Sequence, residues 1–174
     1  MTGHSAPSNR KDLRAQRRRR QHSCWGHLVA APLWPQHGVN LGTLLRSCDA
    51  TGACLAVPRW PWVDEALSRG DTLPRGARPC VHRVGDPIAW LEQQAADGSD
   101  VLGVELLDSA VKLGQLAPAR QRTIVVLGNE GSGIPPEAID SLTGAVEIPM
   151  VGVGTTLNVA VAGTLVLYRL AGLT

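Results

Sequence analysis

Four polar residues could carry out chemistry in this 174-residue chain, and they fall in three separate stretches. Asn40 and Arg46 lie at the start of an apolar helical pattern, Glu130 lies in the glycine-rich turn 128–133, and Asn158 lies one turn inside a second apolar helix. An arginine can stabilise negative charge that develops on an oxygen, and a carboxylate can accept several hydrogen bonds. An asparagine in an apolar helix must find hydrogen-bond partners. Each residue also has a purely structural interpretation: a helix cap, a surface cation, a turn residue or a polar contact in the core.

Two predicted strands would hold glycine-rich turns at one edge of a sheet. Residues 123–127 are rich in β-branched side chains and run into the turn 128–133, and residues 145–148 run into the second turn, 150–154. Glycines permit unusual backbone angles and leave amide groups exposed. The carboxyl ends of parallel strands are the usual place for a ligand. We therefore expect a ligand crevice here, with Glu130 pointing into it.

The rest of the chain alternates between strand and helix patterns. The predicted strands are 28–31, 53–57, 80–84, 101–106, 123–127 and 145–148, and the predicted helices are 39–50, 87–96, a short one from 135, and 156–171. We expect residues 58–79 to form a loop with at most one helical turn near 64–67, and residues 107–121 to form an irregular connection. This alternation predicts an α/β fold with a mostly parallel open sheet.

The first 22 residues differ from the remainder in charge. They hold seven arginines and lysines against Asp12, a net charge of +6, whereas the remainder carries −4. We interpret residues 1–22 as a basic, disordered or loosely helical arm, and residues 23–174 as one globular domain. The arm suggests a polyanionic partner, to which Arg17, Arg18, Arg19 and Arg20 would bind. A solvated tail without a specific role is the alternative.

The four cysteines, Cys24, Cys48, Cys54 and Cys80, form no C-x-x-C pair and no Cys/His spacing typical of a metal site. We expect reduced, mostly buried thiols, no metal and a cytoplasmic location. The basic N-terminal stretch lacks the apolar segment of a signal peptide, although an Arg-rich start could also be an organelle transit segment. The last apolar helix is too short between Asn158 and Arg169 to span a bilayer, so no membrane association is expected.

Taken together, three motifs resemble a known family. They are Asn-x-Gly-x-x-x-Arg at 40–46, Gly-Asn-Glu-Gly-x-Gly at 128–133, and Ile-Pro-Met followed by Thr-Leu-Asn-Val-Ala-Val-Ala within 148–162. In order and spacing they resemble the motifs of the SpoU/TrmH branch of the SPOUT RNA methyltransferases, over roughly residues 27–171. The resemblance implies transfer of a methyl group from S-adenosylmethionine to a ribose 2′-hydroxyl of RNA. It also implies a deep trefoil knot near the C-terminus and a homodimer with the site near its interface.

The resemblance also implies roles for single residues. Arg46 would be the catalytic arginine, Asn40 and Asn158 would help hold it, and Glu130 would shape the substrate side. Thr156 stands where many relatives have serine; it keeps the hydroxyl, but its extra methyl group could crowd the substrate. The cofactor would be held largely by backbone groups of Leu127, Gly128, Ile148, Met150 and Leu157.

The sequence says less about the substrate and the partners than about the site. We expect tRNA rather than rRNA, because the chain shows no separate RNA-binding domain, and we expect Arg59 to contact RNA beside Trp60 and Trp62. The two tryptophans could instead pack at a dimer interface. The last helix is apolar on nearly every side, which independently favours a homodimer. Two alternatives remain: a catalytically idle RNA-binding module with the same fold, and a base-directed RNA methyltransferase.

Overall fold

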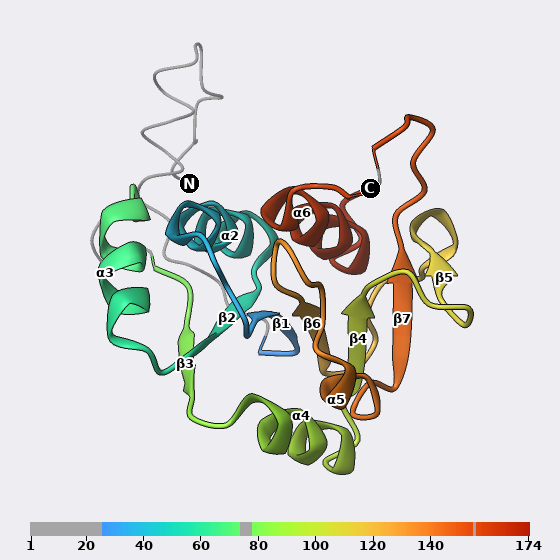
Figure 1. Ribbon diagram of the computed structural model, residues 1–174, viewed down its shortest axis with the longest axis horizontal. Coiled ribbons are helices and arrows are strands. Elements are labelled where there is room, and N and C mark those ends of the chain that lie inside the picture. Colours follow the sequence, from blue (N-terminus) through green and yellow to red (C-terminus); the bar gives the residue numbers. More distant parts are fainter. Residues whose placement is uncertain (1–25, 74–77, 155) are drawn as a thin grey trace, which may run out of the picture.

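The computed structural model describes residues 26–73, 78–154 and 156–174, and these form a sheet with helices on both faces (Figure 1). The sheet has seven strands in the order β3-β2-β1-β6-β4-β7-β5, and all paired strands are parallel. This confirms the predicted α/β class with a mostly parallel sheet. The strands are β1 (Leu28–Pro32), β2 (Cys54–Pro58), β3 (Val81–Val84), β4 (Asp100–Val104), β5 (Val111–Lys112), β6 (Thr123–Leu127) and β7 (Gly144–Glu147).

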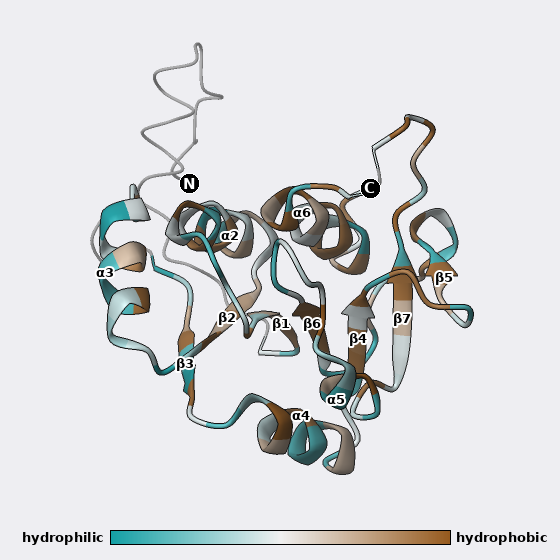
Figure 2. Cartoon of the chain, in the orientation of Figure 1, coloured by the Kyte–Doolittle hydropathy of each residue, from teal (hydrophilic) through white to brown (hydrophobic). Residues whose placement is uncertain are grey.

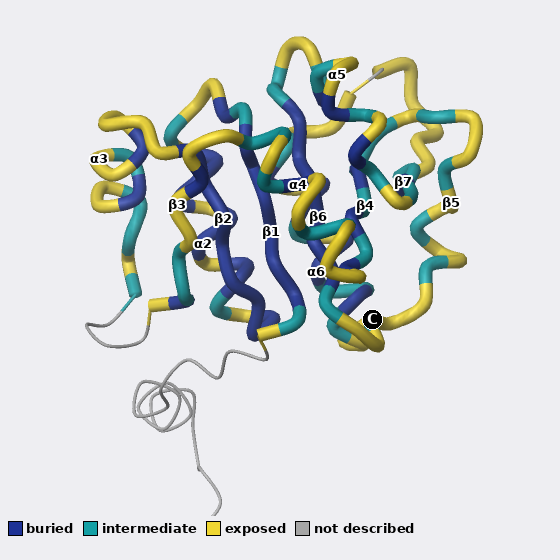
Figure 3. The backbone as a smooth tube through the Cα atoms, turned by 90° about the horizontal axis from the view of Figure 1, so that it is seen from below, coloured by how far each residue is buried: buried dark blue, intermediate teal, exposed yellow. Residues whose placement is uncertain are grey.

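Helices cover the two faces of the sheet unequally. On one face α2 (Gly38–Thr51) lies between α3 (Pro61–Gly70) and α6 (Val159–Leu170), and on the other face lie α4 (Pro87–Ala96) and α5 (Pro136–Ile139) (Figure 1). A short 3₁₀ helix, η1 (Leu113–Gln115), follows β5. Each layer of helices encloses its own apolar cluster against the sheet. The strands β1, β2 and β6 are buried along their whole length (Figure 3), as their apolar sequences require.

One helix was not expected from the sequence. We predicted that residues 58–79 would form a loop with at most one helical turn, but Pro61–Gly70 is a helix of ten residues. Pro61 occupies the first helical turn, where its missing N–H costs nothing, so a residue that suggested a loop in fact begins the helix. Val63 and Leu67, four residues apart, are its buried side chains and hold it on the domain.

The prediction of reduced cysteines is wrong for one pair. Cys54 and Cys80 form a disulfide, with their Cα atoms 4.9 Å apart. The cause is the register of β2 and β3, which pairs Leu55 with Val81 and so places the two preceding residues side by side. A nitrogen of His82 lies within 4.8 Å of both sulfur atoms, which are bonded to each other in this structure.

Cys48 is the residue that fits the earlier expectation of a buried thiol. It is free and fully buried, and burial raises the pKa of its thiol to about 12, with a smaller opposing effect from a backbone hydrogen bond. Cys24, the arm 1–22 and its arginines Arg17, Arg18, Arg19 and Arg20 lie outside the described residues. Within the described ranges, no helix is long and apolar enough to cross a membrane.

Candidate functional site

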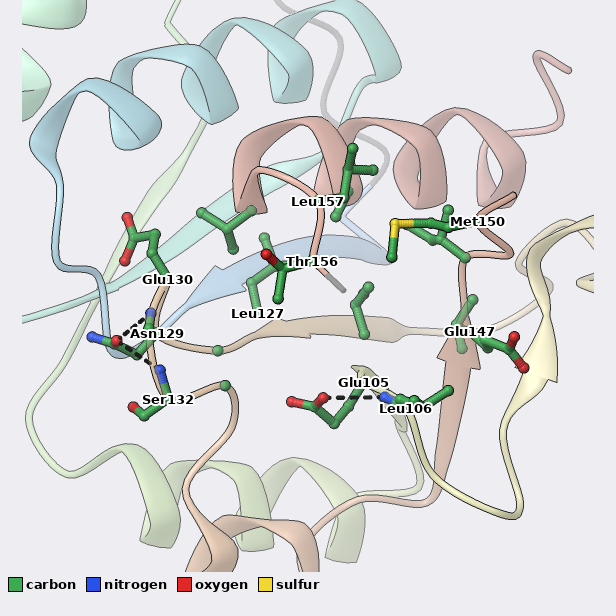
Figure 4. A pocket seen from close by; sticks show the side chains of 18 of the residues that line it. Glu105, Leu106, Leu127, Asn129, Glu130, Ser132, Glu147, Met150, Thr156 and Leu157 are labelled. Carbon is green, nitrogen blue, oxygen red and sulfur yellow. Dashed lines mark hydrogen bonds between the residues drawn. The ribbon is translucent and has the colours of Figure 1, made fainter. Parts of the chain in front are cut away.

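A pocket of about 590 Å³ opens at the carboxyl ends of β4, β6 and β7 (Figure 4). Its walls are residues 104–106, 127–133 and 146–148, together with Met150, Gly152, Gly154, Thr156, Leu157, Val159 and Ala162. The size is that of sites that bind small molecules or cofactors. The two glycine-rich turns predicted to meet at this edge therefore do meet, on either side of one cavity.

All five residues to which the resemblance assigns the cofactor line this pocket: Leu127, Gly128, Ile148, Met150 and Leu157. Gly128 shows why the first turn needs glycine, because a β-carbon there would lie 2.2 Å from the carbonyl carbon of Gly133. The turn closes through two backbone hydrogen bonds between Asn129 and Gly133, of 2.8 and 2.9 Å. The Asn129 side chain adds bonds from the amides of Gly131 and Ser132, so the turn is held from inside.

Glu130 lies at the end of the pocket nearest α2 and is held by three donors. Its carboxylate accepts from the Asn40 side-chain amide at 2.7 Å, and from the backbone amides of Gln36 and His37 at 2.8 and 3.1 Å. Asn40 in turn accepts a hydrogen bond of 3.0 Å from Asn158. Three residues from distant parts of the sequence, each predicted to belong to the site, are thus joined in one network.

Two opposing effects act on the pKa of Glu130. Partial burial raises it, but the hydrogen bonds from Asn40, Gln36 and His37 together with the residue's own amide outweigh burial and leave the pKa lowered. The side chain is therefore a carboxylate acceptor and a poor proton donor at neutral pH.

The start of α6 differs from the prediction. We expected the helix to begin at residue 156 with Asn158 inside it, but α6 begins at Val159 and Asn158 is its N-cap. The Asn158 carboxamide oxygen accepts from the amides of Ala160 and Val161 at 3.0 and 3.2 Å, and its amide nitrogen remains free to bond Asn40. The cap thus satisfies the asparagine and points it at the network. Thr156 is exposed and lines the pocket.

Arg46 lies apart from this network. It is exposed and does not line the pocket. Asn40 and Asn158, which were expected to hold it, are engaged elsewhere: Asn40 donates to Glu130, and Asn158 donates to Asn40. Six positions along a helix turn the side chain by about one and two-thirds turns, so Arg46 cannot share the buried face of Asn40. It lies instead on the outward stripe of α2 with Val39 and Thr43. Its catalytic role stays a prediction.

Two pocket residues were not found from the sequence. Glu105 follows β4, and its two carboxylate oxygens accept from the amides of Ile134 and Leu106 at 3.1 Å each. Figure 4 shows the bond to Leu106. Asn129 also bonds the carbonyl oxygen of Trp34, which ties the turn to the loop after β1. The sequence prediction placed Glu105 inside a strand, 101–106, but β4 ends at Val104, so Glu105 follows it at the carboxyl edge of the sheet.

Arg59 follows β2 at the same edge of the sheet and is exposed. Next to it, the rings of Trp60 and Trp62 lie with their centroids 6.0 Å apart. The structure thus places the predicted RNA-contacting residue on the carboxyl edge that also holds the pocket.

Comparison with known proteins agrees with this geometry. The sequence model of the SpoU rRNA Methylase family matches residues 31–168. A mouse tRNA (guanosine(18)-2′-O)-methyltransferase is 34% identical over 133 residues, which cover 75% of this chain and 8% of that protein. The enzyme of the same name from Escherichia coli K12 is 32% identical over 138 residues, or 75% of this chain and 56% of that protein. The chain thus spans about half or less of these curated relatives.

Solved structures share the fold. The SpoU methyltransferase AviRb from Streptomyces viridochromogenes, in complex with AdoMet, matches with a TM-score of 0.69 and 25% identity, over 90% of this chain and 63% of that one. The family match covers most of the sheet, both glycine-rich turns and nearly all of α6. The chain belongs to the SpoU rRNA Methylase family.

Proposed function

We propose that this protein is an S-adenosylmethionine-dependent methyltransferase that acts on a ribose 2′-hydroxyl of RNA. One observation carries the proposal: a single pocket is lined by all five residues assigned to the cofactor, and the Glu130–Asn40–Asn158 network lies at its end. The names of the mouse and E. coli relatives and the AdoMet complex of AviRb support the same activity and cofactor. A C-terminal trefoil knot, which the resemblance implies, remains part of the proposal.

The pocket suits this cofactor in shape and chemistry. Leu127, Ile148 and Leu157 give it apolar walls, and the turns 128–133 and 150–154 offer backbone groups. S-adenosylmethionine carries positive charge, and Glu105 and Glu130 place carboxylates on the pocket wall. When bound, it would supply an activated methyl group. The residues of the chain would exclude water and hold that group in line with the RNA hydroxyl, which is where much of the acceleration must arise.

The ribose hydroxyl is a weak nucleophile and needs help to lose its proton. Arg46 is unsuited to be a base, because an arginine guanidinium keeps its proton in proteins. We assign it the stabilisation of the developing alkoxide and the positioning of a nearby phosphate, with a phosphate oxygen or a water taking the proton. Glu130 keeps Asn40 and the loop before α2 in place on the substrate side. This scheme assigns no step to a metal ion.

We propose a homodimer in which a second copy covers the outward face of α6. Val161 and Leu165 on that face are 45% and 41% exposed, and Leu157, just before the helix, is 40% exposed. Figure 2 shows much of α6 in the brown of hydrophobic residues. Arg46 lies on the outward side of α2, the neighbouring helix on the same face of the sheet, and Ser47 of α2 hydrogen-bonds Thr164 of α6. The interface would therefore include the presumed active arginine, which makes no contact with the pocket of its own protomer.

We favour tRNA as the substrate, since both curated relatives described above are named for a tRNA nucleoside, whereas the family name refers to rRNA. The phosphate backbone of the RNA would be contacted from two places. One is Arg59 on the surface of the domain 23–174, and the other is the basic arm, with Arg17, Arg18, Arg19 and Arg20.

The test is methyl transfer from labelled S-adenosylmethionine to unmodified tRNA and rRNA transcripts, followed by mass spectrometry of the digested nucleosides. We expect a 2′-O-methylnucleoside in tRNA, unaffected by a metal chelator. A methylated base would favour the base-directed alternative. Absence of S-adenosylmethionine binding by calorimetry, with RNA binding retained, would identify an idle RNA-binding module.

A further inference from the structure

An exposed aromatic pair lies beside the network that holds Glu130. Trp60 and Trp62 are 39% and 38% exposed, and their rings are tilted by 34° with centroids 6.0 Å apart. They stand at the start of α3, immediately after β2 reaches the carboxyl edge of the sheet. Large aromatic side chains that remain half in solvent at the edge of a site are candidates for ligand contact.

The pair is anchored against the start of α2. The Cζ3 atom of Trp62 lies 3.8 Å from the position that a β-carbon on Gly38 would take. Gly38 is the first residue of α2, and two residues later Asn40 bonds Glu130. The amides of Gln36 and His37, just before Gly38, bond the same carboxylate. The tryptophans therefore lie close to the residues that hold Glu130 on the pocket wall.

The charge beside Trp60 and Trp62 favours the binding of a polyanion. Arg59 directly precedes Trp60 and is exposed, and among the described residues no ion pair involves it. The other arginines near α3 are paired: Arg69 with Glu65, and Arg83 with Asp64. A cation beside open aromatic faces is the combination by which proteins hold the phosphates and unstacked bases of single-stranded RNA.

The alternative, packing between two copies, fits the arrangement less well. The exposed apolar residues Val161 and Leu165 are on α6, and α2 lies between α6 and α3 (Figure 1). An interface centred on α6 would leave the tryptophan pair at or beyond its margin, free for another ligand.

We propose that Trp60 and Trp62 form a stacking platform for a base next to the methylated nucleotide, with Arg59 on its phosphate. This inference rests on the proposed function, because an RNA substrate is what brings a base to this surface. It narrows the substrate to RNA that is single-stranded at the target, such as a loop.

The test replaces both rings. The double variant Trp60→Leu/Trp62→Leu keeps apolar bulk but removes the aromatic faces, and Trp60→Phe/Trp62→Phe is the matched control that keeps them. Binding of a fluorescein-labelled single-stranded RNA, measured by anisotropy, should weaken about 10- to 100-fold in the leucine variant and remain close to wild type in the phenylalanine variant. Affinity for S-adenosylmethionine, measured by calorimetry, should be unchanged in both, which shows that the domain is folded.

Two results would overturn the platform: wild-type RNA affinity in the leucine variant, or altered self-association of that variant in sedimentation, which would place the pair at a subunit interface. Wild-type protein should also bind the single strand more tightly than the same sequence as a duplex; equal affinity would refute the platform. Because these measurements need no methyl transfer, a failure of the proposed activity would appear separately, in the transfer assay.

Discussion

Glu130 accepts hydrogen bonds from the backbone amides of Gln36 and His37 and from the Asn40 side chain, and this makes the start of α2 sensitive to acid. Because the pKa of Glu130 is lowered in the folded protein, its contribution to stability is fully present above the pKa of an unfolded glutamate. It is lost as the pH falls through the lower pKa of the folded state. Glu130→Gln should therefore reduce the free energy of unfolding at neutral pH and reduce its dependence on pH on the acid side.

The measurement is urea denaturation from neutral pH down to about pH 3, across the usual carboxyl range. Glu137→Gln is the control, since Glu137 is exposed on α5 and outside the network. Identical acid profiles for wild type and Glu130→Gln would show that these hydrogen bonds do not stabilise the folded state.

Arg46 should affect catalysis without affecting cofactor binding. It lies outside the pocket, so Arg46→Ala should leave the affinity for S-adenosylmethionine unchanged. Loss of a group that stabilises a developing oxyanion lowers kcat by about 10²- to 10³-fold. Arg46→Lys should recover only part of the loss, because lysine keeps the charge but not the planar fork of donors.

Single-turnover methyl transfer and calorimetry on the same preparations separate these effects. Arg120→Ala is a suitable control, because Arg120 is also exposed and also lies outside the pocket. Full activity of Arg46→Ala on an RNA that wild type methylates would remove Arg46 from the mechanism.

Among the elements, α2 and α3 approach each other through two glycines. A β-carbon on Gly42 would lie 2.7 Å from the Cα of Gly70, and one on Gly70 would lie 2.5 Å from the Cα of Gly42. Both clashes are with backbone, so neither can be relieved by turning a side chain. Gly42→Ala should force the helices apart and lower the free energy of unfolding by about 1–3 kcal/mol, despite the better helix propensity of alanine.

Thermal and urea denaturation of Gly42→Ala checks this prediction, with Gly114→Ala as the control variant. A β-carbon on Gly114 would have no atom within 4 Å, and its φ is not positive, so that variant should be neutral. Since Trp62 lies on α3 close to Gly38 at the start of α2, Gly42→Ala should also weaken RNA binding. Equal stability of the two variants would mean that the helices separate without cost.

At the scale of helices and strands, the sequence predicts well those elements whose bounds depend on local sequence pattern. The β-branched run of β6 and the apolar spacing of α2 each appear close to their predicted bounds. What failed depended on tertiary partners. Helix α3 is held by Val63 and Leu67 against α2, and the Cys54–Cys80 disulfide follows from a strand register that no local pattern contains.

The candidate site also has a part that local sequence pattern predicts and a part that depends on tertiary contacts. The crevice with Glu130 beside it was predicted because glycine-rich turns follow buried strands in the sequence. The assignment of five pocket residues to the cofactor came from the family resemblance. That Asn158 is a helix cap bonded to Asn40 could not be predicted, because the two are 118 positions apart and meet only through the packing of α6 on α2. The separation of Arg46 from Asn40, by contrast, follows from their spacing of six positions along the predicted helix, which puts them on different faces.

At the scale of the whole molecule, the outward face of α6 is apolar, and no other part of the described chain covers it. Along α6 the buried residues alternate with Val161 and Leu165, which are 45% and 41% exposed. The proposed homodimer would bury this face together with the outward side of α2, which carries Arg46. A charge placed at its centre would be desolvated without a partner, at a cost of about 3–5 kcal/mol.

Leu165→Glu should therefore convert the dimer to a monomer, or raise its dissociation constant at least about a hundred-fold, as measured by sedimentation velocity over a range of protein concentrations. If Arg46 acts at the interface, methyl transfer should fall in proportion to the loss of dimer and recover partly at high protein concentration. Val111→Glu is the matched control: Val111 is 44% exposed, but it lies on β5 at the far edge of the sheet from α2 and α3. A wild-type protein that is monomeric yet active, or a Leu165→Glu variant that stays dimeric, would contradict the assignment of this face.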